Sequence, residues 1–182
     1  MKATGIVRRI DDLGRVVVPK EIRRTLRIRE GTAMEIFTDK NGEIILKKYS
    51  PIGELGSFAQ QYVDATAQII GRVVCVSDRD QIIAVAGAPK REFIGKVIHK
   101  ELEEAINDRE AILAKKGEKK YIKILSNSEE EYEGEIVQTI LCEGDAIGAV
   151  IILGRTEDEV LGEAERKAAV IAANFLGSQM EG

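Results

Sequence analysis

The chain has 182 residues and a formal net charge of −4, with 27 Lys and Arg against 31 Asp and Glu. No apolar run approaches the roughly 20 residues of a membrane-spanning helix, and no apolar signal region opens the chain. We therefore expect one or two domains that do not span a membrane and that remain in the cytoplasm. The charge is uneven, because residues 1–50 carry 12 Lys and Arg against 7 Asp and Glu, whereas residues 51–182 carry 15 against 24. This asymmetry predicts a basic nucleic-acid-binding module joined to an acidic module with another task.

Residues 4–28 predict a strand, a tight turn, a second strand and a short helix. The segments 6–10 and 15–18 are rich in β-branched residues, and Asp-Asp-Leu-Gly between them is typical of a turn. Pro19 ends the second strand because it has no N–H for a strand partner, and it suits the first turn of a helix. The helix then places Ile22 and Leu26 on one face and leaves two arginines on the other.

Five arginines lie on this predicted hairpin and helix, where three acids, Asp11, Asp12 and Glu21, accompany them. Planar guanidinium groups suit phosphate and the edge of guanine. No helix face of alternating charge is present to neutralise them. We therefore interpret this surface as a DNA-binding site in preference to a solvated basic patch. The candidate DNA-binding residues are Arg8, Arg9, Arg15, Arg23 and Arg24.

A second hairpin is predicted at 34–47, where two strand segments, 34–38 and 43–47, flank a loop that contains Asn-Gly. A module of about 50 residues buries little core of its own. Three consecutive valines at 16–18 nevertheless indicate a strand that is covered on both faces. An intertwined dimer of two chains satisfies both observations.

Residues 1–50 closely resemble the AbrB/MazE-type swapped-hairpin DNA-binding domain. The resemblance implies an intertwined β-barrel dimer, in which two chains interleave their hairpins, that binds double-stranded DNA. The resemblance implies that the DNA contacts are Arg8, Arg15, Arg23 and Arg24, and we add Arg9 because it lies beside them. The segments that carry the resemblance are Thr-Gly-Ile-Val-Arg at 4–8, Asp-Leu-Gly-Arg-Val-Val-Val-Pro at 12–19, Ile-Arg-Arg-Thr-Leu at 22–26 and Leu-Lys-Lys-Tyr at 46–49.

The rest of the chain predicts a second domain. Ser-Pro-Ile-Gly at 50–53 indicates a boundary, with residues 51–53 as a short linker. A capping box at 156–159 predicts the start of the last helix, whose wide apolar stripe indicates burial against its own sheet and against a partner. The patterns predict an α+β arrangement. We expect helices at 54–71, 92–107 and 156–179, and strands at 73–76, 82–85, 121–125, 136–141 and 146–153.

Residues 54–182 resemble a GAF-type sensor domain, an α/β sandwich, in the order of their elements and in the Asp-Arg-Asp hairpin at 78–80. The Asn-Lys, Phe and Asp-Glu signature of GAF domains that bind cyclic nucleotides is absent. The resemblance therefore implies a sensor and oligomerisation domain with no cofactor and an unknown small-molecule ligand, if any. The chain as a whole resembles a family of bacterial regulators of sporulation genes.

The sequence offers little for catalysis. Its only histidine, His99, lies in a helical stretch without a neighbouring nucleophile, and no glycine-rich phosphate-binding loop is present. We therefore expect a nucleoid-associated transcription regulator and not an enzyme. The alternative is an antitoxin-like DNA-binding autoregulator whose C-terminal part wraps a toxin. The length and periodicity of the C-terminal part favour a domain with its own core.

Two self-association surfaces follow from these elements. One is the intertwined N-terminal dimer, and the other pairs the acidic domains through the helices at 54–71 and 156–179 as a four-helix bundle. If both contacts join the same two chains, the product is a dimer, and if the domains exchange partners, it is a tetramer. The sequence leaves this choice open, and the resemblance favours a homotetramer, a dimer of dimers.

Overall fold

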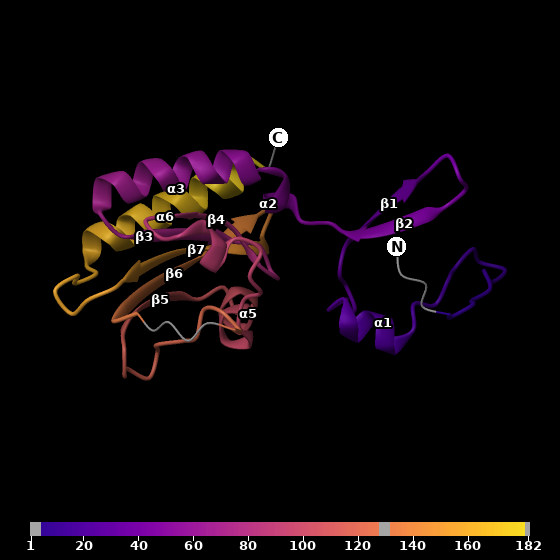
Figure 1. The fold of residues 1–182 in the computed structure, drawn as a ribbon, viewed down its shortest axis with the longest axis horizontal. Coiled ribbons are helices and arrows are strands. Elements are labelled where there is room, and N and C mark those ends of the chain that lie inside the picture. Colours follow the sequence, from indigo (N-terminus) through magenta and orange to yellow (C-terminus); the bar gives the residue numbers. More distant parts are fainter. Residues whose placement is uncertain (1–4, 128–131, 181–182) are drawn as a thin grey trace. The chain divides into compact units, whose positions relative to one another are not determined.

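The chain forms two compact units, Met1–Tyr49 and Ser50–Gly182, which we call the N-terminal unit and the C-terminal unit (Figure 1). The computed structural model describes residues 5–127 and 132–180. Helices and strands both occur, so the predicted α+β class is confirmed. None of the helices in the described ranges is long and apolar enough to cross a lipid bilayer.

The N-terminal unit contains one short helix and one antiparallel hairpin, which confirms the predicted second hairpin. Asp39 closes the hairpin loop, since its Oδ1 atom accepts hydrogen bonds of 2.9 Å from the backbone N–H groups of Asn41 and Glu43. An aspartate that bonds the backbone ahead of it in this way stabilises a turn. The elements are α1 Lys20–Thr25, β1 Met34–Thr38 and β2 Ile44–Lys48.

The first predicted hairpin is wrong as a pair of strands, because no strand forms at 6–10 or at 15–18. Pro19 is buried, and every other described residue of the N-terminal unit is half-buried or exposed. Val7 is 85% exposed and Val17 is 70% exposed. A lone hairpin is at best marginally stable without apolar surface to cover one of its faces. In a single chain these strand-like segments have no such surface, which explains why only the turn between them forms.

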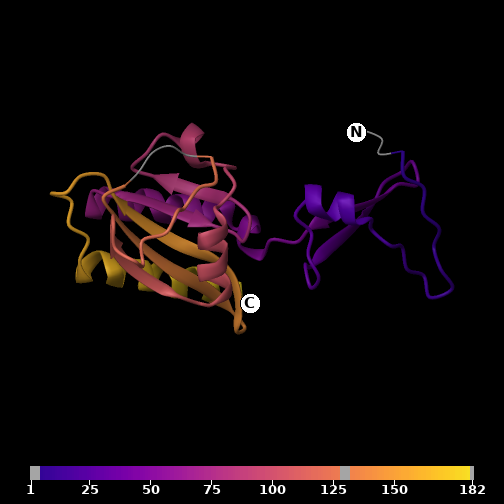
Figure 2. The same cartoon turned by 90° about the horizontal axis from the view of Figure 1, so that it is seen from below.

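The C-terminal unit is built on one antiparallel sheet with the strand order β4-β3-β7-β6-β5. Helices α3 and α6 lie side by side on one face of the sheet, and α5 covers the other (Figures 1 and 2). The helices are α2 Pro51–Glu54, α3 Gly56–Ile70, α4 Lys90–Phe93, α5 Lys100–Asn107 and α6 Glu163–Ser178. The strands are β3 Val73–Ser77, β4 Ile82–Ala86, β5 Ala111–Lys115, β6 Gly134–Cys142 and β7 Asp145–Gly154.

Alternation along the central strands builds an apolar cluster on each face of the sheet. On β6, Ile136 and Ile140 belong to the cluster under α3 and α6, where Leu176 is also fully buried. Val137 belongs to the cluster on the opposite face, together with Leu102 of α5. The C-terminal unit therefore has the enclosed core that the described N-terminal unit lacks.

The predicted linker at 51–53 is wrong as an irregular segment, because these residues belong to α2. The Oγ atom of Ser50 accepts a hydrogen bond from the N–H of Gly53 at 3.2 Å and donates one to Oδ2 of Asp78 at 3.1 Å. Ile52 is completely buried in the cluster under α3 and α6. Pro51 stands at the first position of the helix, where its missing N–H costs nothing.

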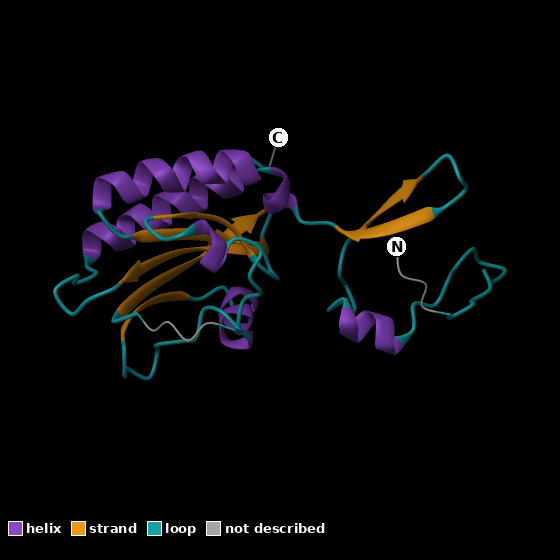
Figure 3. Cartoon of the chain, viewed as in Figure 1, coloured by secondary structure: helices purple, strands orange, loops and turns teal. Residues whose placement is uncertain are grey.

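The other predicted elements are confirmed to within a few residues, except for two in the middle of the unit and the start of the last helix. The predicted helix at 92–107 is divided into α4 and α5, because Gly95 turns the chain with a φ of 73°. The predicted strand at 121–125 is instead irregular, and the strand that pairs with β6 is β5 (Figure 3). We call residues 121–126 the strap, since carboxylates of β6 and α5 bind two of its backbone N–H groups and its end bonds to the backbone of residues 97–99.

The last helix begins at Glu163 and not at Thr156. Glu159, which the capping box places opposite Thr156, accepts a hydrogen bond from the backbone N–H of Arg155 at 2.6 Å and so closes a turn. The reach-back contact at the true helix start is made by Glu165, whose Oε2 atom accepts from the N–H of Gly162 at 2.9 Å. Side-chain bonds to nearby backbone stabilise turns as readily as helix ends, which is why the motif misplaced the start.

Candidate nucleic-acid interface

Asp11 organises the turn at 11–15, which we call the Arg15 turn. Its Oδ1 atom accepts hydrogen bonds from the backbone N–H groups of Leu13 at 3.0 Å and Arg15 at 2.8 Å. Its own N–H donates to the carbonyl oxygen of Arg15, also at 3.0 Å. Gly14 has a φ of 76°, in the left-handed region that glycine enters without steric penalty. The turn predicted at Asp-Asp-Leu-Gly is thus present, and it fixes the backbone of Arg15.

The side chain of Arg15 is fixed by the same carboxylate. Its Nε atom donates to Oδ2 of Asp11 at 2.8 Å, while 68% of the Arg15 side chain remains exposed. The bond from the Arg15 backbone N–H, followed by the bond from its guanidinium, lowers the pKa of Asp11 below its ordinary value. The terminal nitrogens Nη1 and Nη2 of Arg15 make no hydrogen bond to residues 5–127 or 132–180.

Arg8 and Arg9 lie in the irregular segment that leads into the Arg15 turn, and both are exposed. The Nη1 atom of Arg8 donates to the carbonyl oxygen of Val7 at 3.3 Å. Arg9 makes no side-chain hydrogen bond or ion pair with any residue that the structure describes. Both guanidinium groups are therefore open to an anionic partner.

The helix α1 presents the other two arginines. It begins after Pro19, whose carbonyl oxygen accepts a hydrogen bond of 3.0 Å from the backbone N–H of Arg23. The Nε atom of Arg23 donates to the carbonyl oxygen of Val18 at 3.2 Å, which ties this side chain back to the segment before the helix. Arg24 is exposed and makes no side-chain hydrogen bond within the described part of the chain.

The five predicted DNA-binding residues are thus divided between two places, the Arg15 turn with the segment before it and the helix α1. Of these arginines, Arg15 alone forms an ion pair with a described residue. The acids Asp12 and Glu21 form none with the described residues. The role of Asp11 as the partner of Arg15 was not predicted from the sequence. The sequence does contain a signal for this pair. Asp11 opens a tight turn and therefore lies opposite Arg15, the residue that closes the turn.

A buried carboxyl group lies in the C-terminal unit, on β6. Glu135 is fully buried between the apolar cross-strand neighbours Ala114 and Leu153, and its Oε1 atom accepts a hydrogen bond of 2.7 Å from the N–H of Ile122 in the strap. Its Oε2 atom has no partner among the described residues. Burial raises the pKa of Glu135 to about 8, the N–H of Ile122 opposes this rise, and Glu101 adds to it. Glu135 was not among the residues predicted from the sequence to have a functional role.

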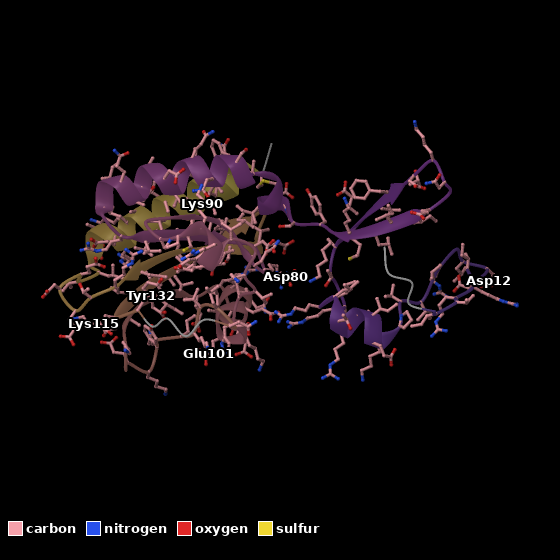
Figure 4. The ribbon with its side chains drawn as sticks, in the orientation of Figure 1. Asp12, Asp80, Lys90, Glu101, Lys115 and Tyr132 are labelled. Carbon is pink, nitrogen blue, oxygen red and sulfur yellow. The ribbon has the colours of Figure 1, made fainter. Side chains whose placement is uncertain are left out.

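Figure 4 shows Glu101 on α5, and a backbone N–H of the strap also binds this carboxylate. Its Oε2 atom accepts a hydrogen bond of 2.6 Å from the N–H of Lys123. Its backbone N–H donates to Nδ1 of His99 at 3.3 Å, so that the only histidine of the chain caps α5. These bonds assign His99 and Glu101 a structural role in holding the strap and the helix.

Comparisons with known proteins cover both units. The family model described as "Stage V sporulation protein T C-terminal, transcription factor" matches residues 54–181, and the model described as "Antidote-toxin recognition MazE, bacterial antitoxin" matches residues 7–54. The chain is 51% identical over 181 residues to stage V sporulation protein T of Bacillus subtilis (strain 168), with 100% of this chain and 99% of that protein covered. It is 63% identical over 51 residues to the transition state regulatory protein AbrB of the same strain, with 28% of this chain and 52% of that protein covered.

The C-terminal unit also resembles the GAF domain of an Acinetobacter phosphoenolpyruvate-protein phosphotransferase. The TM-score is 0.59 at 12% identity, and the match covers 71% of this chain and 87% of that chain. This likeness confirms the predicted GAF-like fold. The two units together define a protein in which an AbrB-like, arginine-rich N-terminal unit precedes a GAF-like domain. The chain belongs to the stage V sporulation protein T family, a family of transcription factors.

Proposed function

We propose that this chain is a DNA-binding regulator of sporulation genes, with residues 1–50 as the DNA-binding domain and residues 54–182 as a sensor and oligomerisation domain. The observation that carries the proposal is the set of exposed arginines in a member of a transcription-factor family, of which Arg15 alone is paired with a described acid. A regulator of this kind acts by binding and not by catalysis, and it lies with the DNA on the nucleoid. The DNA-binding residues are Arg8, Arg9, Arg15, Arg23 and Arg24.

Phosphate contacts from these side chains supply most of the affinity, because each one releases counterions from the DNA. Base contacts are few, so the shape and deformability of the DNA contribute to the choice of site. Arg23 suits a fixed contact because its Nε bond to the carbonyl oxygen of Val18 limits its rotation. Arg9 and Arg24, without such bonds, suit mobile contacts to the phosphate backbone.

The N-terminal unit acts as a dimer whose chains exchange hairpins. Its described residues bury almost no apolar side chain, and Leu13 and Val17 are 69% and 70% exposed. A second copy that supplies the missing strand partners would cover them and allow the segments 6–10 and 15–18 to form strands. The apolar surface of these segments, together with the resemblance to the swapped-hairpin domain, supports this arrangement.

The C-terminal units pair through α3 and α6, and the whole assembly is a homotetramer. Phe58 and Tyr62 of α3 stack near Phe175 of α6, with ring centroids 5.4 and 5.6 Å apart. Phe175 is 38% exposed, and Ile171, one turn before it, is 61% exposed. Apolar side chains on two adjacent helices form the kind of surface that a four-helix bundle buries.

An antitoxin-like autoregulator is the second candidate, and the match of residues 7–54 to the MazE antitoxin model favours it. Such a protein would use its C-terminal part to wrap a toxin. The enclosed clusters on both faces of the sheet instead support a C-terminal part that folds without a partner. A purified chain with a cooperative unfolding transition in the C-terminal unit would therefore favour the regulator over the antitoxin.

The GAF-like fold makes the C-terminal unit the place where a small-molecule ligand would bind, and a purely structural domain is the alternative. The absence of the cyclic-nucleotide signature from the sequence leads us to expect no heat on calorimetric titration with cyclic nucleotides. Tight, saturable binding of a cyclic nucleotide would contradict this part of the proposal.

The proposed function is tested by DNA binding of the full chain and by mapping of the sites it occupies in sporulating cells. We expect binding to duplex DNA that weakens steeply between about 50 and 200 mM salt. We also expect the mapped sites to lie near sporulation genes. A chain that binds no duplex even at low salt would exclude the proposal.

A further inference from the structure

Arg15 is held at three points by a single residue. Its backbone N–H and its Nε atom both donate to the carboxylate of Asp11, at 2.8 Å each, and its carbonyl oxygen accepts from the Asp11 N–H at 3.0 Å. The four remaining N–H groups of the guanidinium, on Nη1 and Nη2, have no partner among the described residues. The carboxylate therefore fixes the direction of the side chain and leaves its terminal edge available.

We propose that Asp11 is a positioning residue that sets the specificity of the DNA contact made by Arg15. This inference rests on the proposed function. A guanidinium whose Nε is already bonded can offer its two terminal nitrogens together to one bidentate acceptor. The O6 and N7 atoms of guanine form such an acceptor, and so do two oxygens of a phosphate.

The charge of Asp11 favours the guanine edge over phosphate as the acceptor for Arg15. A carboxylate 2.8 Å from Nε offsets the positive charge of Arg15 and repels phosphate, so it weakens attraction that does not depend on sequence. Hydrogen bonds to a base edge depend on direction, and Asp11 supplies that direction before the DNA arrives. Asp11 therefore lowers affinity for arbitrary DNA more than it lowers affinity for a preferred site.

The substitution Asp11→Asn isolates this effect. The amide oxygen can still accept from the backbone N–H groups of Leu13 and Arg15, so the turn is retained. The amide nitrogen cannot accept from Nε of Arg15, so the side chain is released and its charge is uncovered. An exposed pair of this kind contributes little to folding, so the variant should fold.

Asp12 provides a matched control. It stands at the tip of the same turn (Figure 4), and its side chain has no hydrogen bond or ion pair with the described residues. Asp12→Asn changes the charge of the turn by the same amount and leaves the bonds to Arg15 intact. A difference between the two variants therefore reports the contact with Arg15 and not the general charge.

The experiment measures the affinity of the full chain for two duplexes, one carrying a site recovered by mapping and one with the same bases in scrambled order, over a salt series. We expect Asp11→Asn to strengthen binding to the scrambled duplex and to lower the ratio of the two affinities by about tenfold. Asp12→Asn should leave that ratio unchanged. In an Arg15→Ala background, Asp11→Asn should no longer change the ratio, because the residue through which it acts is gone.

A measurement without DNA completes the test. The Nε–H proton of Arg15 should exchange slowly in the wild-type chain and in Asp12→Asn, and rapidly in Asp11→Asn. Suppose that the wild-type chain binds the mapped duplex more tightly than the scrambled one, and that Asp11→Asn has the same ratio of affinities. This result would overturn the proposed role of Asp11 and leave the proposed function intact. If the wild-type chain binds neither duplex, the proposed function itself fails.

Discussion

The carboxylate of Glu135 on β6 accepts a hydrogen bond of 2.7 Å from the backbone N–H of Ile122 in the strap. This bond joins a completely buried side chain to an irregular segment that the sequence suggested as a strand. Glu135 takes the place of a strand partner for one backbone N–H, and Glu101 does the same for the next at Lys123. Together with backbone hydrogen bonds between residues 97–99 and the end of the strap, these two bonds hold the strap in place without a strand ladder.

Glu135 should make the stability of the C-terminal unit depend on pH. Its pKa is about 8 in the folded chain, against an ordinary value of 4.5. Between these values the folded chain keeps a proton that the unfolded chain has lost. The contribution of Glu135 to the free energy of unfolding is therefore fully present below pH 4.5. It is lost as the pH rises from 4.5 through about 8, by up to about 1.4 kcal/mol per pH unit.

Glu135→Gln should remove this dependence, because the amide cannot ionise and its oxygen can still accept from Ile122. At the upper end of the range the variant should be more stable than wild type, and at the lower end the two should be similar. Urea unfolding followed by circular dichroism across that pH range measures the difference. The exposed Glu157→Gln serves as the control and should follow wild type. A parallel pH profile for Glu135→Gln and wild type would contradict the prediction.

Arg15→Ala and Arg23→Ala should each weaken DNA binding without unfolding the chain. Both side chains are exposed, so the free energy of unfolding should change by no more than about 0.5 kcal/mol. Each lost phosphate contact should reduce the slope of log affinity against log salt by about one unit. Arg91→Ala removes the same charge from the C-terminal unit, at a side chain that is 87% exposed, and should leave the slope unchanged. Unaltered affinity and slope in the first two variants would exclude these arginines as contacts.

Gly177→Ala should destabilise the C-terminal unit, because α6 approaches the β6–β7 hairpin closely at this glycine. An added Cβ atom would lie 2.1 Å from the backbone carbonyl oxygen of Leu141, so the helix would have to shift. We expect a loss of about 1 to 3 kcal/mol in the free energy of unfolding. Gly56→Ala, where an added Cβ meets no atom within 4 Å, should cost nothing and can stabilise α3 slightly. Equal thermal midpoints for the two variants would show that α6 tolerates the larger residue.

Ile171→Asp should halve the mass of the assembly from four chains to two if α3 and α6 pair the C-terminal units. The side chain is 61% exposed, so the change should affect association and not the fold of the single unit. Light scattering on the full chain measures the mass. Ile94→Asp makes the same change at an isoleucine that is 40% exposed outside these helices, and it should leave a tetramer. A tetramer that survives Ile171→Asp would place the interface elsewhere.

The sequence by itself determined the elements whose signals are local. The loop of the hairpin at 34–48, the turn at 11–15 and the left-handed Gly71 at the end of α3 follow from residues a few positions apart, and all are present. Local patterns also identified the five arginines as exposed cations, because charged side chains with few nearby acids remain at the surface.

Tertiary structure alone decided the features that depend on residues far apart in the chain. The strap is irregular because Glu135 and Glu101, from β6 and α5, bind its N–H groups, and β5 takes the place beside β6. Pro51 begins a helix because the core offers a buried position for Ile52. The segments at 6–10 and 15–18 remain irregular because a single chain has no apolar surface to cover them. Periodicity in the sequence predicts which faces are apolar. Whether another surface buries those faces depends on tertiary packing.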